Sequence, residues 1–156
     1  MEALRLSGAK TGSEVMLAGF SLGGLEAANL AADTSFPYSV KAVVTAGSPV
    51  ALMDVSSHVT LPSFEHRGDP VPRLDGAANP GTAYWTTLSA KEQVVPAPSA
   101  SSPVPARYPT VCAATASRAQ ASGDPSVAAM ETVDVFLSGA KGALQDWEVS
   151  RLEQQP

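Results

Sequence analysis

A short apolar run, a serine flanked by glycines and an apolar-faced helix follow one another between residues 15 and 32. This succession constrains the fold more than any other feature. Residues 15–19 are apolar and bounded by turn residues, which predicts a strand buried on both faces of a parallel sheet. Residues 22–32 repeat apolar side chains at helical spacing. A β-branched run at residues 40–46 predicts a second strand, and strand, helix and strand predict a parallel βαβ crossover.

Two further strands are predicted downstream, at residues 59–65 and 84–88. The first of them ends in the turn Gly68-Asp69-Pro70, and a loop rich in glycine and proline precedes the second. The predicted fold class is therefore α/β, with a parallel sheet of about three to four strands flanked by helices.

The remaining segments are predicted from helix-capping residues and from the prolines and glycines that interrupt regular structure. The chain begins with the end of a helix, and two later helices are expected, at residues 108–121 and between Asp124 and Gly139. Residues 94–105 hold four prolines, which favours an extended surface loop. A single domain over residues 1–156 is expected, with a poorly ordered tail at about 140–156.

Composition excludes several classes of protein. A hydrophobic fraction of 44% and a charged fraction of 16% are typical of a globular chain. The net charge of −5 argues against nonspecific nucleic-acid binding, which needs a basic face. No apolar run reaches the length of a transmembrane segment, and cytoplasmic localisation is expected. Cys112 is the single cysteine, so no intrachain disulfide can form and no cysteine-based metal site is expected.

The sequence Gly-Phe-Ser-Leu-Gly-Gly at residues 19–24 predicts a nucleophile elbow. A serine hydroxyl is a weak nucleophile, so Ser21 would have to protrude from a sharp, strained turn toward a base. Gly19 and Gly23 are expected to let the strand and the helix approach closely. The N–H of Leu22 would point toward the developing oxyanion, where the helix dipole adds positive potential.

Two other interpretations of this motif exist. The first is a glycine- and serine-rich turn between strand and helix with no chemistry. The second is a phosphate-binding loop, but the motif lacks the lysine and the glycine spacing that such loops use. The strand before the motif and the apolar-faced helix after it favour the elbow.

With residues 15–24, the stretches at 43–49 and 65–72 make the chain resemble the α/β-hydrolases. The resemblance is to the lipase-like, esterase type, in particular to bacterial relatives of the PGAP1-like branch. It runs from about residue 13 to about residue 139. It implies a serine hydrolase acting on a small-molecule carboxylic ester, with Ser21 as nucleophile and no metal or cofactor. Asp69 would be the acid that orients and stabilises the catalytic histidine; the alternative for Asp69 is a turn-forming residue.

The resemblance also identifies departures from the family. Both histidines, His58 and His66, precede Asp69, whereas the family base follows the acid. The position of that base is Arg107, whose guanidinium stays protonated at neutral pH. Five residues later Cys112 replaces the family's tyrosine. His66 could substitute as the base, or it could be a structural residue beside the Asp69 turn.

A second departure concerns the strands that precede the elbow in this family. They are missing here, so the chain is expected to be the C-terminal portion of a longer hydrolase fold. An exposed edge of the elbow strand could then favour self-association. Two functions remain open at this stage. One is an active serine hydrolase, and the other is a catalytically impaired fragment or pseudoenzyme that binds a ligand or partner.

Overall fold

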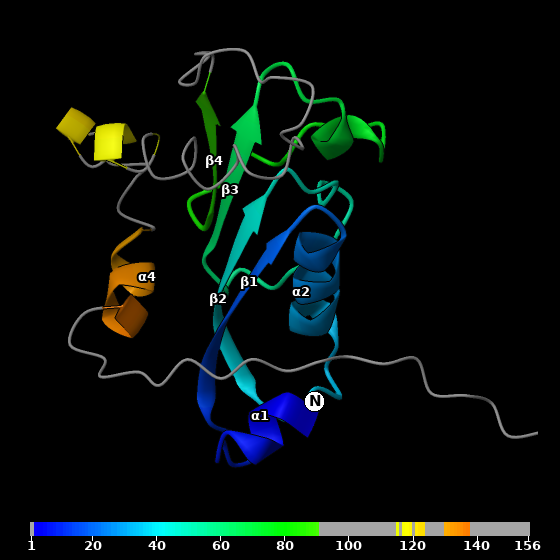
Figure 1. Cartoon of the computed structure of the whole chain (residues 1–156), viewed down its shortest axis with the longest axis vertical. Coiled ribbons are helices and arrows are strands. Elements are labelled where there is room, and N and C mark those ends of the chain that lie inside the picture. The colour runs from blue at the N-terminus through cyan, green and yellow to red at the C-terminus, as the bar shows by residue number, and fades with distance from the viewer. Residues whose placement is uncertain (1, 91–114, 116, 120, 124–129, 138–156) are drawn as a thin grey trace, which may run out of the picture.

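A four-stranded, all-parallel sheet forms the centre of the computed structural model, which describes residues 2–90, 115, 117–119, 121–123 and 130–137 (Figure 1). The strands are β1 (Glu14–Phe20), β2 (Ser39–Ala46), β3 (Leu61–His66) and β4 (Trp85–Ala90). They lie in chain order, β1-β2-β3-β4, so β1 and β4 are the outer strands of the described sheet. The predicted α/β class with parallel strands and flanking helices is confirmed.

The first crossover has the bounds that the hydrophobic pattern predicted. Helix α2 (Leu22–Ala32) follows β1 after a single residue and packs on β1 and β2. The two strands pair in parallel, with Gly19 opposite Thr45. Small residues face the sheet from α2, and Ala28 is completely buried, which lets the helix axis lie close to the strands.

The strand β3 begins two residues later than predicted because the chain is still turning at Val59, whose N–H donates to the carbonyl oxygen of Ser56. Pairing of β3 with β2 is also interrupted. An isolated bridge joins Ala42 to Thr60, and the ladder resumes only at Thr45 and Ser63. Pro62 lies inside this gap and has no N–H to donate. On its other side β3 pairs continuously with β4.

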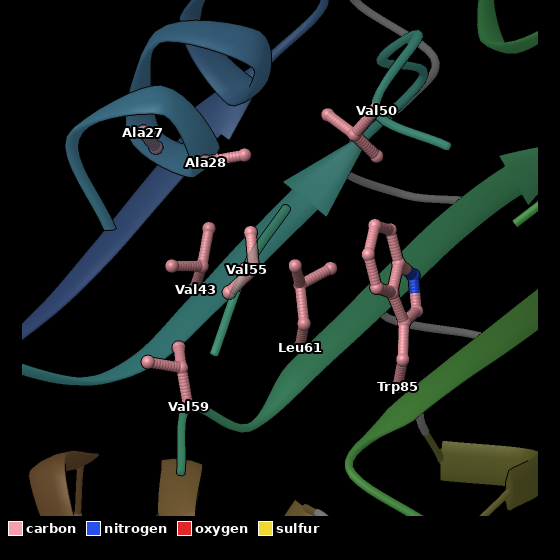
Figure 2. Packing of buried hydrophobic residues seen from close by; sticks show 8 residues of the cluster. All are labelled: Ala27, Ala28, Val43, Val50, Val55, Val59, Leu61 and Trp85. Atoms are coloured by element: carbon pink, nitrogen blue, oxygen red, sulfur yellow. The ribbon is translucent and has the colours of Figure 1, made fainter. Parts of the chain in front are cut away.

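The main hydrophobic core lies between the sheet and α2 (Figure 2). It combines residues of α2, the middle strands and the loop between β2 and β3, and its members are Ala27, Ala28, Val43, Val50, Val55, Val59, Leu61 and Trp85. The loop at residues 47–60 contains no helix, yet its three valines complete the core. The indole Nε1 of Trp85 donates to the hydroxyl of Ser63 at 3.1 Å, and the Thr45 hydroxyl donates to the same oxygen at 3.0 Å.

Helix α4 (Met130–Leu137) lies across the sheet from α2 (Figure 1). The Thr60 hydroxyl donates to that of Thr132 at 3.2 Å, and Val133 is buried. The first helix, α1 (Glu2–Leu6), precedes the sheet.

Several predicted features lie outside the described residues: the loop at 94–105, the positions of Arg107 and Cys112, and the tail at 140–156. No helix in the described part of the chain combines the length and apolar character needed to cross a membrane.

Candidate active site

Ser21 is the residue that connects β1 to α2, and its backbone has an unusual conformation. Its φ is 53° and its ψ is −121°, and no other non-glycine residue in the described ranges has a positive φ. L-residues rarely adopt this region, and doing so costs of order 1–3 kcal/mol. The Ser21 N–H donates to the carbonyl oxygen of Ala46, at the end of β2, at 2.8 Å. The sharp, strained turn predicted at this serine is therefore present.

Two glycines make the turn possible by allowing backbone to approach backbone. A Cβ on Gly19 would fall well inside 3.0 Å of the backbone of Gly23 and of the Gly24 nitrogen. A Cβ on Gly24 would collide with the hydroxyl of Ser48 and lie 3.0 Å from the Gly19 carbonyl oxygen. At Gly19 a larger residue would force the strand and the helix apart, and at Gly24 it would first displace the side chain of Ser48.

The prediction that Gly23 allows the strand and the helix to approach closely was wrong. A Cβ at Gly23 would meet nothing within 4 Å, because that side of the first helical turn faces open space. Gly24, one position later, is the helix residue that needs to lack a side chain. The reason is tertiary, since a Cβ on Gly24 would meet Ser48, in the turn after β2, and Gly19, on β1.

Leu22 is the first residue of α2, so its N–H lies in the turn whose amides have no intrahelical acceptor. That position suits the predicted donation to an oxyanion. The side chains on either side of Ser21 are apolar and exposed, at 41% for Phe20 and 65% for Leu22. The surroundings of the serine therefore present hydrocarbon to solvent.

Asp69 lies three residues beyond the end of β3 and Ser21 directly follows β1, so both lie at the carboxyl edge of this parallel sheet. Its N–H donates to the carbonyl oxygen of His66 at 2.9 Å, and its Oδ1 accepts the N–H of Val71 at 3.0 Å. The second bond is the Asx turn that the alternative interpretation anticipated. One strand, β2, separates the strands that carry Ser21 and Asp69. The role of Asp69 as an acid stays a prediction.

His66 is the last residue of β3, and its imidazole is already engaged locally. Its Nδ1 accepts the N–H of Gly68 at 3.1 Å, so in the neutral ring the proton lies on Nε2. A triad base needs the opposite tautomer, with Nδ1–H donating to the acid. This geometry suits a structural role better than that of a base. His58 is exposed and lies before β3, at the amino edge of the sheet.

The side chain of Asn79 forms a polar cluster with Glu65 and Thr87 beside the carboxyl edge of the sheet, and this cluster was not predicted from the sequence. The side-chain amide of Asn79 donates to Glu65 at 2.6 Å and to the Thr87 hydroxyl at 3.2 Å. Its own oxygen is buried and has no hydrogen-bond partner among the described residues. The sequence of β3 gave no alternation signal for this cluster, because its first four residues are all buried and Glu65 shares a strand face with both Leu61 and Ser63.

Burial raises the pKa of Glu65 above its ordinary value, and the neighbouring carboxylates Asp75 and Asp69 raise it further. The guanidinium of Arg73 acts in the opposite direction. Asp75 also connects two loops, because its carboxylate accepts the N–H of Ala51 at 2.8 Å.

Within the described ranges, no group of three or more histidine, cysteine or acidic side chains is arranged to hold a metal ion.

Comparison with protein-family models, with curated proteins and with solved structures finds no match for this chain. The candidate site is therefore defined by its own geometry. It consists of a strained serine between a parallel strand and a helix, with an acidic turn two strands away at the same edge.

Proposed function

We propose that this protein is a serine hydrolase of the carboxylic-ester, lipase-like type, with Ser21 as its nucleophile. The observation that carries the proposal is the Ser21 backbone, at φ 53° and ψ −121°, between a parallel strand and the helix that follows it. Such strained conformations cluster at functional sites, and they persist only where the surrounding structure holds them in place. Here the support comes from Gly19, Gly24 and the carbonyl of Ala46.

The chemistry follows from that geometry. The Ser21 Oγ attacks the ester carbonyl carbon while a base takes its proton, and the tetrahedral oxyanion is stabilised by the Leu22 N–H and the α2 N-terminus. Collapse expels the alcohol, which recovers the proton, and leaves an acyl-enzyme. Water then adds to the acyl carbon and releases the acid and the free hydroxyl. Asp69 orients the base, and exposed Phe20 and Leu22 favour an apolar acyl group.

A specific observation favours a second candidate function, a hydrolase-like domain that binds a ligand without turning it over. The chain has two histidines, and both precede Asp69. One of them, His66, uses its Nδ1 to accept a backbone N–H. At the predicted position of the base the chain has Arg107, whose guanidinium stays protonated and cannot accept a proton from Ser21.

A fluorophosphonate probe separates the two candidates. We expect the probe to label the purified protein at one site, and Ser21→Ala to abolish both labelling and hydrolysis of p-nitrophenyl acetate. Ser35→Ala is the matched control, because Ser35 is exposed and lies in the loop after α2. If Arg107 holds the base position, Arg107→His should raise the labelling rate. Absence of labelling in folded wild type would overturn the hydrolase proposal and favour the binding domain.

A further inference from the structure

Ser48 is a buried hydroxyl that the proposed mechanism does not use. It follows β2 in the turn Gly47-Ser48-Pro49 and is only 3% exposed. Gly47 has a φ of 57°, a left-handed conformation that turns the chain back toward the end of its own strand. As a result the Ser48 hydroxyl donates to the carbonyl oxygen of Ala46 at 3.1 Å.

That carbonyl is also the acceptor that holds Ser21. The Ser21 N–H donates to the Ala46 oxygen at 2.8 Å, so two donors converge on one acceptor. A carbonyl oxygen has two lone pairs and can accept both. The Ser48 hydroxyl and the Ser21 N–H therefore share the Ala46 oxygen as their acceptor.

A second contact places Ser48 on the other side of the elbow. Its hydroxyl and Cβ occupy the space where a side chain on Gly24 would project. Gly24 in turn donates its N–H to the carbonyl oxygen of Ser21 at 3.1 Å. Ser48 thus lies beside two of the three residues whose backbone groups hydrogen-bond to Ser21, Ala46 on β2 and Gly24 on α2; the third is Leu25, whose N–H donates to the Ser21 carbonyl oxygen at 3.4 Å.

We propose that Ser48 is a positioning residue for Ser21, acting through the Ala46 carbonyl and the first turn of α2. This inference rests on the proposed function for its effect on reactivity, but not for its effect on the backbone. Loss of the hydroxyl leaves the Ala46 oxygen with one donor and opens space beside Gly24. Ser21 then samples conformations in which its Oγ and the Leu22 N–H are no longer aligned.

The test compares Ser48→Ala with Ser63→Ala. Ser63 is similarly buried, at 2%, and accepts two hydrogen bonds, but its donors are the side chains of Thr45 and Trp85 and not a residue of the turn around Ser21. Two quantities are measured in the folded proteins. One is the rate of fluorophosphonate labelling, and the other is amide hydrogen exchange at Ser21 relative to Val43, whose N–H donates to Thr60 within the sheet. Dividing the exchange protection of the Ser21 amide by that of the Val43 amide removes the contribution of global stability.

We expect Ser48→Ala to lower both the labelling rate and the Ser21-to-Val43 protection ratio by about two- to tenfold, the factor that corresponds to one lost hydrogen bond. Ser63→Ala should lower the melting temperature and leave both quantities at wild-type values. An unchanged protection ratio in Ser48→Ala would overturn the inference, whatever the labelling result. Unlabelled wild type with a lowered ratio would instead refute the hydrolase proposal and leave the positioning role standing.

Discussion

Alanine substitutions at the three glycines of the elbow should have three different effects on stability. A Cβ at Gly19 would overlap the backbone of Gly23 and Gly24, and backbone cannot rotate away. Overpacking a core costs about 1–3 kcal/mol, and occasionally more. We expect Gly19→Ala to lie at or above the upper end of that range, because β1 and α2 must separate to admit the methyl group.

Gly24→Ala should be milder. Its methyl group would meet the hydroxyl of Ser48, a side chain that can rotate, and would lie 2.9 Å from the Ser48 Cβ. The same overpacking range applies, but alanine is about 1 kcal/mol more favourable than glycine inside a helix. The net loss should therefore be about 0–2 kcal/mol. Gly23→Ala meets nothing within 4 Å, so only the helix term remains and stability should rise by about 0.5–1 kcal/mol.

Urea unfolding followed by tryptophan fluorescence measures these differences, because Trp85 is 2% exposed in the folded state. The expected order of stability is Gly23→Ala, then wild type, then Gly24→Ala, then Gly19→Ala. A Gly23→Ala protein less stable than wild type by more than about 1 kcal/mol would refute the packing argument. So would a Gly19→Ala protein within about 0.5 kcal/mol of wild type.

Two further predictions concern strain and protonation. Glycine tolerates the backbone angles of Ser21, so Ser21→Gly should stabilise the protein by about 1 kcal/mol in the same urea assay, whereas Ser21→Ala should not. The folded-state pKa of Glu65 is raised above its ordinary value of 4.5. Its stabilising contribution is thus complete below that pH and is lost as the pH rises through the folded-state pKa. The melting temperature of Glu65→Gln relative to wild type should therefore increase from pH 4.5 to pH 8; a constant difference would contradict this.

The predictions from sequence succeeded where the signal was local. Strand β1, helix α2 and strand β2 follow the apolar pattern within one residue at each end, because turn residues bound the short apolar runs of the strands and apolar side chains recur at helical spacing between them. The start of β3 was less accurate. Val59 and Leu61 are both buried, and the pattern alone could not show that the chain still turns at Val59.

The site was harder to predict because its constraints are tertiary. The motif identified Ser21, but the choice between Gly23 and Gly24 depends on Ser48, which lies on another strand's turn. The partnership of Glu65 and Asn79 joins residues 14 apart through a loop with no periodic signal. The hydrogen bond from Gly68 to His66 likewise depends on the exact turn after β3.

The hydrogen bond from Ser21 to Ala46 also has a consequence for the order in which the protein matures. Ser21 is synthesised 25 residues before its acceptor, so its N–H cannot donate to the Ala46 carbonyl until β2 is made and paired. The hydrogen-bonded conformation of Ser21 is thus completed after translation of its own motif, and only when β1 and β2 are correctly paired. If Ser21 is the nucleophile, an unfinished or misfolded chain would lack the support that holds it in the strained conformation.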